Sequence, residues 1–425
     1  MSDATPERTS SGTQAAFARV SALVDERASA LVDERASALV DRLGSKDAPR
    51  LVRAPGRVNL IGEHTDYNLG FVLPAAIDRE IWLAFEPWNE PKVELTSIDM
   101  GETRSFALAD LSLDARATRS WIDYVAATAW SMRQAGLPVR GFRGVLDSTI
   151  PLGSGLSSSA ALEMAATWAL ADPEAERPGP ARMAAIAQRG ENLYVGVNCG
   201  IMDQFASAAG KMGDALFIDC RSNEFQLAPM PNGLTIVVCD TSSPRKLDAS
   251  AYNERRAECE LGASLIGEME PGVTTLRDVN EEMLALHRAR LPEVVGRRCE
   301  HIVRENDRVQ ATVAALRDGD LEALRRLFAA SHASMRDLFE ISSLELDAMV
   351  EIAAKVPGVV ASRMTGGGFG GCTVNLVHAG HEQALMDRVM AEYPARTGLV
   401  PRVFAAATVN GAGLFDPGLG SPGVS

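Results

Sequence analysis

The sequence predicts an α+β fold of two lobes, in which mixed sheets and packed helices leave a cleft between the lobes. The chain has 425 residues, of which 46% are hydrophobic and 23% charged, so it is too long for one simple core. Apolar, β-branched segments typical of strands alternate with longer segments of helical spacing. We expect an N-terminal extension over residues 1–46, a first lobe over 47–230 and a second lobe over 231–425.

The N-terminal extension contains an internal repeat. SALVDERA occupies residues 21–28 and again 29–36, and SALVDR follows at 37–42. The composition is helical, but a period of eight moves the Leu-Val pair by about 80° per repeat on an ideal helix. The apolar stripe therefore winds around the helix and forms no coiled-coil seam. We expect a lengthened entry helix without a functional role, and a monomer.

Charge and cysteine usage exclude several classes of partner. The net charge of −14 argues against nucleic acid, because binding to phosphate backbones depends on Lys and Arg. The six cysteines stand singly without a Cys-x-x-Cys pair, which favours reduced thiols in the cytoplasm. The polar N-terminus and the absence of a long apolar run predict neither secretion nor a membrane span.

Residues 53–78, here called the signature segment, carry the densest chemistry of the chain. At its centre three ionisable side chains and a hydroxyl are consecutive, Glu63-His64-Thr65-Asp66. Carboxylate acceptors and imidazole donors at fixed positions suit a polyhydroxylated ligand. An acidic surface turn or a metal site is the alternative. Both rank lower, since no second His or Cys stands nearby at zinc spacing.

A glycine- and serine-rich loop follows three predicted strands at residues 81–86, 92–98 and 142–150. This Gly/Ser loop, residues 151–160, reads PLGSGLSSSA and leads into a helical pattern over residues 161–170. Glycines and free N–H groups at a helix start form an anion site. The Gly-Lys-Ser/Thr element of a Walker A loop is missing, so a hydroxyl and a carboxylate are expected as magnesium ligands. Alone, such a loop is equally often only a helix cap.

Two acidic residues follow in the next part of the chain. Glu191 lies in the helical pattern of residues 181–196, where a solvated glutamate is the common alternative. Asp203 lies in the segment NCGIMDQF, residues 198–205, among apolar neighbours. Burial of such a carboxylate requires a charge partner or a chemical task.

The second half begins with a predicted strand at 234–239 and a helix at 249–269, and further helices follow at 294–316, 321–332 and 344–356. The glycine turn, residues 364–372, reads MTGGGFGGC. It fits Gly-x-Gly-x-x-Gly by counting, but the next residues are strand-like, so a dinucleotide-binding fold is excluded. A turn against a nucleotide and a tight hairpin have equal weight.

Three motifs resemble one enzyme family. RVNLIGEHTDY in the signature segment resembles the galactose-recognition signature of galactokinases, within the family of galacto-, homoserine, mevalonate and phosphomevalonate kinases. The Gly/Ser loop resembles the ATP-binding motif of that family, and the glycine turn resembles its third motif. The three extend from Arg53 to Thr373, which is most of the chain. The resemblance implies a two-lobed small-molecule kinase fold with the active site in the cleft and the glycine turn as one wall.

The resemblance also implies a reaction and a set of residues. The expected activity is phosphorylation of the anomeric hydroxyl of galactose by ATP with Mg²⁺, which gives galactose 1-phosphate and begins galactose catabolism. Asp203 is implied as the base, with Arg57 beside it as charge stabiliser, and Ser159 and Glu191 as magnesium ligands. The implied galactose contacts are Glu63, His64, Thr65, Asp66, Gly200 and Tyr252. The implied ATP contacts are Gly153, Ser154, Gly155, Leu156, Ser157, Ser158 and Ser159.

Two alternatives stay open from the sequence. A sugar sensor on the same fold would bind galactose and ATP without turnover, but the complete catalytic set of Arg57, Ser159, Glu191 and Asp203 favours an enzyme. A kinase for a related sugar, such as N-acetylgalactosamine or arabinose, is the second alternative. Leu69 supports it, because the family more often has a small or acidic residue there, and the run Pro244-Arg245-Lys246 also departs from the family pattern.

Overall fold

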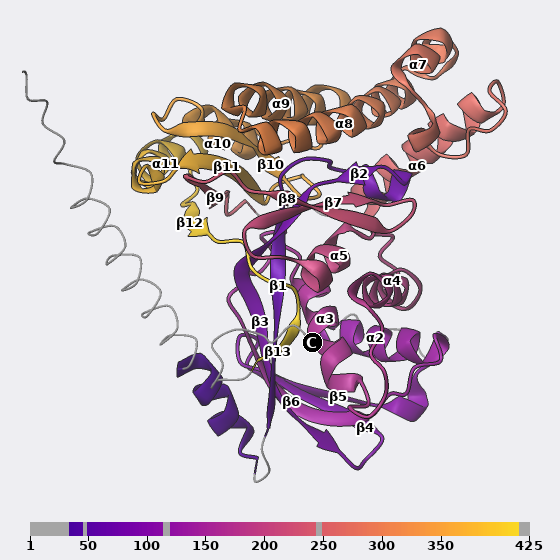
Figure 1. Cartoon of the computed structure of the whole chain (residues 1–425), viewed down its shortest axis with the longest axis vertical. Helices are drawn as coiled ribbons and strands as arrows, with labels where there is room; N and C mark the ends of the chain where they lie inside the picture. The colour runs from indigo at the N-terminus through magenta and orange to yellow at the C-terminus, as the bar shows by residue number, and fades with distance from the viewer. Residues whose placement is uncertain (1–33, 46–48, 114–119, 244–248, 416–425) are drawn as a thin grey trace, which may run out of the picture.

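The computed structural model describes residues 34–45, 49–113, 120–243 and 249–415. They form three sheets with helices packed on them (Figure 1). The largest sheet has six strands in the order β13-β1-β3-β6-β4-β5. In chain order these strands are β1 (Arg50–Asn59), β3 (Pro74–Trp88), β4 (Lys92–Ser97), β5 (Glu102–Ala107), β6 (Gly141–Ser148) and β13 (Gly413–Phe415). All pairs in this sheet are antiparallel except β4 with β6, so the sheet is mixed as expected.

Two smaller sheets complete the fold. The four-stranded sheet has the order β10-β11-β9-β12 and the three-stranded sheet the order β2-β7-β8. Their strands are β2 (Phe71–Val72), β7 (Asp214–Asp219), β8 (Glu224–Pro229), β9 (Leu234–Asp240), β10 (Val359–Thr365), β11 (Cys372–His378) and β12 (Arg402–Ala406). The glycine turn joins β10 to β11, which pair antiparallel. The expected strand after this turn, and with it the exclusion of a dinucleotide-binding fold, is confirmed.

The helices fall into two groups (Figure 1). The first group lies beside the six-stranded sheet, with α3 packed directly on β1 and β3. It comprises α2 (Ile122–Gln134), α3 (Ser158–Leu170), α4 (Pro180–Gly190) and α5 (Met202–Ala209). The second group includes α9 and α10, which pack on the four-stranded sheet. It comprises α6 (Ala249–Gly267), α7 (Glu281–His287), α8 (Glu293–Asp318), α9 (Leu321–Ser334), α10 (Leu344–Ala353) and α11 (Glu382–Thr397).

The two ends of the described chain lie on the first sheet. Residues 34–43 are helical, and Ala36 and Leu39 are buried there in a cluster with Trp82 and Phe415. The earlier part of the repeat, residues 21–33, lies outside the described residues. β13 pairs with β1, although residues up to 425 were expected in the second lobe. A three-residue strand gives too weak a pattern for sequence to assign its sheet.

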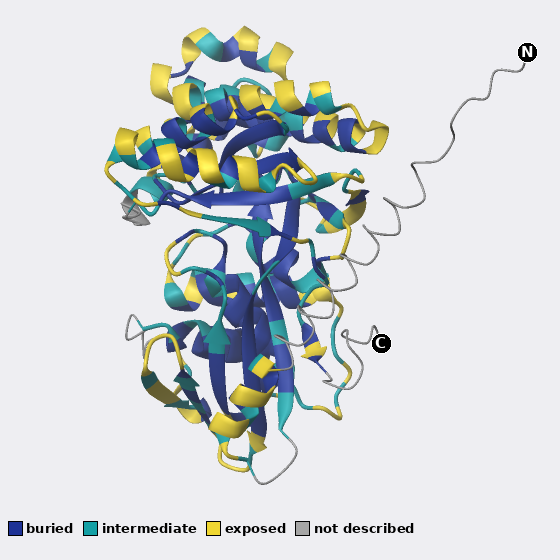
Figure 2. Cartoon of the chain, turned by 90° about the vertical axis from the view of Figure 1, so that its left-hand side faces the viewer, coloured by how far each residue is buried: buried dark blue, intermediate teal, exposed yellow. Residues whose placement is uncertain are grey.

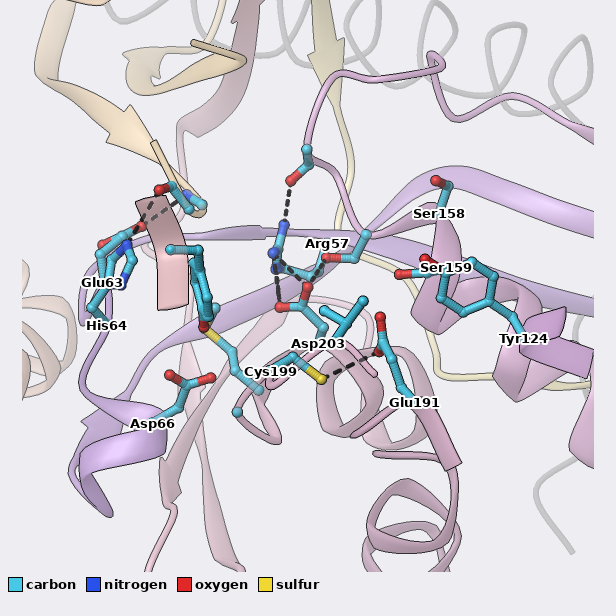
Figure 3. Close-up of a pocket in the computed structure, with 18 of the residues that line it drawn as sticks. Arg57, Glu63, His64, Asp66, Tyr124, Ser158, Ser159, Glu191, Cys199 and Asp203 are labelled. Atoms are coloured by element: carbon cyan, nitrogen blue, oxygen red, sulfur yellow. Dashed lines mark hydrogen bonds and ion pairs between the residues drawn. The ribbon is translucent and has the colours of Figure 1, made fainter. Parts of the chain in front are cut away.

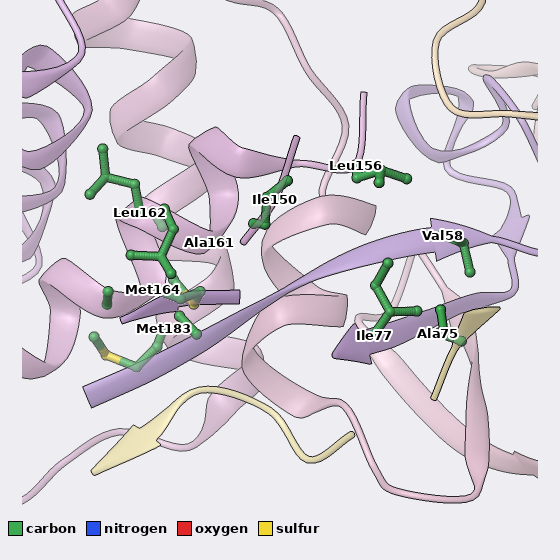
Figure 4. Close-up of a cluster of buried hydrophobic side chains, with 14 of the residues drawn as sticks. Val58, Ala75, Ile77, Ile150, Leu156, Ala161, Leu162, Met164 and Met183 are labelled. Atoms are coloured by element: carbon green, nitrogen blue, oxygen red, sulfur yellow. The ribbon is translucent and has the colours of Figure 1, made fainter. Parts of the chain in front are cut away.

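A hydrophobic core extends beneath the Gly/Ser loop (Figure 4). Val58, Leu156 and Ala161 are all fully buried there, so the strand, the loop and α3 share one core. Burying a large apolar side chain contributes about 1.5–3 kcal/mol. Figure 2 shows that the strands inside the molecule are buried and that the outer helices carry the exposed faces. Packing in this core therefore fixes β1, the Gly/Ser loop and α3, which carry the candidate site.

Two properties of the described residues concern the cellular setting. All six cysteines lie in the described residues, and no disulfide joins them. No helix in the described ranges combines the length and apolar character that crossing a membrane requires. Cytoplasmic location and a monomeric state stay predictions.

Candidate active site

One cavity, of about 480 Å³, brings the sequence motifs together. Figure 3 shows the Arg57–Asp203 pair between residues of the signature segment on one side and residues of the Gly/Ser loop on the other. The residues that line the cavity are Arg57, Glu63, His64, Asp66, Tyr124, Gly153, Gly155, Ser157, Ser158, Ser159, Glu191, Val197, Cys199, Gly200, Met202, Asp203, Tyr252, Asn253, Gly366 and Gly367.

A bulge in β1 positions Arg57. The register between β1 and β3 shifts between Pro55 and Gly56, and the Arg57 N–H donates to the Leu156 carbonyl at 3.1 Å. A Cβ on Gly56 would lie 2.5 Å from the same carbonyl oxygen, so glycine is needed for this close approach. The bulge therefore fastens β1 to the Gly/Ser loop and directs the next side chain into the cavity.

Arg57 and Asp203 form a bidentate ion pair. Arg57 Nε donates to Asp203 Oδ1 at 2.9 Å, and Nη2 donates to Oδ2 at 2.8 Å. Nη1 donates to the Gly155 carbonyl at 2.8 Å. Asp203 lies in the first turn of α5 and its side chain is 29% exposed, whereas that of Arg57 is 4% exposed. The expectation that the two are neighbours is confirmed, and the carboxylate is the member of the pair that a ligand can reach.

The Gly/Ser loop contributes some of its residues to the cavity and not others. Ser157 caps α3 in a left-handed conformation with φ of 64°, and its hydroxyl donates to Asp203 Oδ2 at 2.6 Å. The next two serines begin α3 and line the cavity with Gly153 and Gly155. Ser154 and Leu156 do not line it. The Ser154 hydroxyl donates to the Pro151 carbonyl at 2.7 Å and Leu156 is core, so neither side chain faces the cavity.

His64 and Asp66 lie on the opposite side of the cavity. Burial lowers the pKa of His64 to about 3, so the ring is neutral. Its Nε2 is 3.2 Å from the Gly367 carbonyl and its Nδ1 is 2.8 Å from the Tyr67 hydroxyl, which assigns the proton to Nε2. Burial, followed by the charge of Asp203, raises the pKa of Asp66 to about 6.

Glu63 faces the cavity but is already held by the protein. It forms an ion pair with the fully buried Arg363, and it accepts from the Gly366 N–H at 3.1 Å. Burial raises its pKa to about 7 against the opposing effect of Arg363. These contacts connect the signature segment to β10 and to the glycine turn.

Thr65 and Leu69, both singled out from the sequence, lie outside the cavity lining. Thr65 is fully buried, and its hydroxyl lies 2.9 Å from the Gly62 carbonyl and 2.6 Å from that of Phe71. A sugar contact is expected at Thr65, and in this structure its hydroxyl closes the turn. Leu69 has a left-handed conformation with φ of 58°, which small or acidic residues adopt more readily.

Glu191 and Ser159 meet on the third side of the cavity. Glu191 begins a π-helical turn that follows α4, and Ser159 lines the same cavity from the first turn of α3. Burial raises the pKa of Glu191 to about 7, and raises that of nearby Glu163 well above its usual range, with the charge of Glu191 adding to the second shift.

The described residues contain no ready group of three or more His, Cys, Asp or Glu for a metal ion. Glu163 Oε1 is buried without a hydrogen-bond partner. The Ser159 hydroxyl and the Glu191 carboxylate are nevertheless hard oxygen donors in one cavity. Mg²⁺ prefers such donors, and beside a nucleotide it keeps several waters and takes only one or two protein ligands. The residues therefore fit magnesium.

Sequence reasoning missed several residues of the cavity. Tyr124 comes from α2, and Asn253 follows Tyr252 on α6. Neither carries a local signal, because only the packing of α2 and α6 brings them to the site. Cys199 was part of a recognised motif, and its Sγ lies 3.3 Å from Glu191 Oε2. Pro244-Arg245-Lys246 lies outside the described residues.

Comparison with known proteins supports the motifs over most of the chain. Residues 39–87 match the profile of the galactokinase galactose-binding signature, residues 123–211 that of the GHMP kinase N-terminal domain, and residues 312–395 that of the GHMP kinase C-terminal domain. A galactokinase from Chloroflexus aurantiacus is 43% identical over 86% of this chain and 93% of its own length. A galactokinase from Roseiflexus is 40% identical over 85% and 92%. The chain belongs to the galactokinases.

Solved structures agree with this membership. The crystal structure of Lactococcus lactis galactokinase complexed with galactose superimposes with a TM-score of 0.83 at 33% identity, over 87% of this chain and 96% of that one. Mevalonate kinase from Methanococcus jannaschii, at 17% identity and a TM-score of 0.58, shares the fold. The predicted two-lobed α+β kinase fold and the galactokinase assignment are confirmed. GHMP kinase membership also implies that the protein uses ATP.

Proposed function

We propose that this galactokinase transfers the γ-phosphoryl group of ATP to the anomeric hydroxyl of α-D-galactose, the entry step of galactose catabolism. The observation that carries the proposal is the position of Asp203, which lies between the signature segment and the Gly/Ser loop in one cavity. A sugar bound to the first and a triphosphate bound to the second would meet at this carboxylate. The galactokinase relatives and the galactose-bound homologue support this choice of substrate.

In this proposal Asp203 is the base. Its carboxylate accepts the proton of the anomeric hydroxyl as the new O–P bond forms and the bond from the γ-phosphorus to ADP breaks. Positioning and electrostatics supply most of the rate in phosphoryl transfer, because little covalent work falls to the protein. The three hydrogen bonds that Asp203 receives from Arg57 and Ser157 fix the direction of the carboxylate, and the guanidinium adds positive charge next to the transferring group.

The signature segment supplies the sugar contacts in this proposal. Glu63, His64 and Asp66 border the sugar in this proposal, together with the Gly200 backbone and Tyr252, and the two carboxylates offer acceptors to its hydroxyls. Selectivity built on hydrogen bonds is sharp, since a misplaced hydroxyl leaves buried polar groups unpaired. Galactose should therefore react much faster than glucose.

Ser159 and Glu191 would hold magnesium. When bound, this ion neutralises charge on the phosphate oxygens of ATP. The N–H groups at the start of α3 and the glycines of the Gly/Ser loop add favourable dipoles for the same phosphates. The loop has no Walker-type lysine, so its charge neutralisation depends on the metal and on backbone donors.

The test is a screen of ADP release across monosaccharides, followed by NMR of the product. We expect galactose to be the best substrate among galactose, N-acetylgalactosamine, arabinose, glucose and mevalonate, with phosphorus attached to the anomeric oxygen. Faster turnover of another compound would contradict the sugar assignment. Phosphorylation at another hydroxyl would contradict the role of Asp203 as base for the anomeric proton.

A further inference from the structure

Beneath the cavity, the buried side chains of Glu163 and Gln204 are hydrogen-bonded to each other and to Glu191, the candidate magnesium ligand. Gln204 Nε2 donates to Glu191 Oε2 at 2.6 Å and to Glu163 Oε2 at 3.0 Å. A side-chain amide has two N–H groups, so each carboxylate takes one of them. Glu163 and Gln204 are both fully buried, and neither lines the cavity.

These hydrogen bonds connect three elements that each contribute residues to the cavity. Gln204 follows Asp203 on α5, and Glu163 lies one helical turn after Ser159 on α3. Glu191 begins the π-helical turn after α4. Both α3 and α5 therefore place residues in the cavity and one further polar residue beneath it, and Gln204 joins Glu163 to Glu191.

A buried acid and amide are unfavourable groups for a protein core. Among the described residues, no cationic side chain forms an ion pair with Glu163. Glu163 Oε1 and Gln204 Oε1 are buried without hydrogen-bond partners, and an unpaired buried acceptor destabilises the folded state. Apolar side chains of the same volume would pack here at lower cost. Packing alone gives no reason for an acid and an amide at these positions.

The contacts of Glu191 fix the orientation of its carboxylate. Its Oε2 atom receives the Gln204 amide and the Cys199 thiol, at 2.6 and 3.3 Å, so the carboxylate is oriented from below and from one side. Ser159, the other candidate metal ligand, lines the same cavity. A carboxylate fixed in this way meets a cation without first losing rotational freedom, which is the usual contribution of residues behind metal ligands.

We propose that Gln204 and Glu163 are positioning residues that hold the Glu191 carboxylate toward Ser159 and thereby set the affinity of the site for a divalent cation. This inference rests on the proposed role of Glu191 and Ser159. It predicts that loss of the Gln204 amide weakens metal binding without affecting the binding of galactose.

The experiment compares Gln204→Leu with wild type in two measurements, the Mg²⁺ concentration for half-maximal activity and the calorimetric affinity for Mn²⁺ with ADP. Removal of a residue behind a metal ligand typically weakens metal binding by about 10- to 100-fold, and we expect a loss in that range with KM for galactose unchanged. Gln310→Leu is the control, because the Gln310 amide donates within its own helix, to the Asn306 carbonyl at 3.4 Å, and Gln310 does not line the cavity. It should bind Mn²⁺ as wild type does.

Changes at Glu163 test the same hydrogen bonds independently if Gln204→Leu does not fold. Glu163→Gln keeps an acceptor for the Gln204 amide and should retain metal affinity, whereas Glu163→Leu should lose it. In a Glu191→Gln background, Gln204→Leu should cause no further loss. A folded Gln204→Leu or Glu163→Leu protein with wild-type Mn²⁺ affinity would overturn the positioning role. Wild-type affinity in Glu191→Gln would instead overturn the proposed metal ligand itself.

Discussion

At Gly200 there is no room for a side chain. A Cβ built on this residue would lie 1.8 Å from Asp66 Oδ2, although its backbone angle is not in the left-handed region. The constraint comes from the neighbouring carboxylate, so Gly200 and Asp66 jointly shape one side of the cavity.

The first prediction is that Gly200→Ala displaces Asp66 and lowers kcat/KM for galactose, mainly through KM. A misplacement of about 1 Å in a binding site can reduce the rate about 10²-fold. Steady-state kinetics with varied galactose at saturating ATP would measure the effect. Gly179→Ala is the control, because a Cβ there meets nothing within 4 Å. An unchanged KM in Gly200→Ala would show that Asp66 does not bind the sugar.

The second prediction concerns Arg57. Arg57→Ala removes the bidentate partner of Asp203 and should reduce kcat by about 10²- to 10³-fold, in the range known for loss of one charge-stabilising donor. Added guanidinium should restore part of the activity, since the cavity left by the side chain borders Gly155 and Asp203. Full activity of Arg57→Ala without guanidinium would contradict its role.

At the residue scale, sequence predicted the members of motifs better than their individual tasks. Asp203 and Arg57 were correctly expected as neighbours. Thr65 belongs to an equally clear motif, yet its hydroxyl closes a turn. Motif membership does not separate residues that touch a ligand from residues that shape the loop. Gln204 was within a quoted motif, but its partners come from other helices, so no local pattern could reveal its contacts.

At the scale of elements, β1 and β3 share a buried ion pair away from the cavity. Arg53 Nη2 lies 3.1 Å from Glu80 Oε1, and burial raises the pKa of Glu80 to about 7. The folded state therefore retains a proton that the unfolded chain has lost at the same pH. This contribution to stability is complete below the unfolded pKa, near 4.5, and is lost as pH rises toward about 7.

The third prediction is that Glu80→Gln reduces this pH dependence. Unfolding free energy of wild type should contain a component that falls between pH 4.5 and pH 7, on the order of 3 kcal/mol, and the variant should lack it. Denaturant unfolding across this pH range is the measurement, with the exposed Glu90→Gln as control. Identical pH dependence in wild type and Glu80→Gln would show that Glu80 has no raised pKa.

The fourth prediction concerns the repeat. Deletion of residues 29–36 joins residues 21–28 to residue 37, and both units read SALVDERA. The buried position of Ala36 and the ion pair of Arg35 with Asp147 would then be filled by identical residues from the preceding unit. Activity and melting temperature should stay near wild type. A folded deletion protein without activity would contradict the absence of a functional role.

Most helices and strands could be predicted because their apolar spacing is set by the core that they share. The predicted first residues of three helices, 249, 321 and 344, agree with the starts of α6, α9 and α10. The π-helical turn at Glu191 and the return of β13 to the first sheet could not be predicted, because both depend on contacts made by the folded chain. Glu191 was therefore expected within a regular helix.

At the scale of the whole molecule, the site exists only where distant parts of the chain meet. β1 supplies Arg57, α5 supplies Asp203, α6 supplies Tyr252, and the turn between β10 and β11 supplies Gly366 and Gly367. Galactose and ATP should therefore both bind between the two groups of helices that Figure 1 shows. The resemblance of three motifs predicted this meeting point, whereas the supporting contacts of Arg363 with Glu63 required the structure.

The most direct measurement is single-turnover phosphorylation of galactose by Asp203→Asn, combined with calorimetric binding of galactose and of a non-reactive ATP analogue. The central claim is that Asp203 performs the proton transfer at the meeting point of the two substrates. We expect binding of both ligands to be retained, the melting temperature to stay near that of the exposed control Asp318→Asn, and the chemical step to slow by about 10²- to 10⁴-fold. A folded Asp203→Asn protein that binds both ligands and phosphorylates galactose at nearly the wild-type rate would contradict the claim.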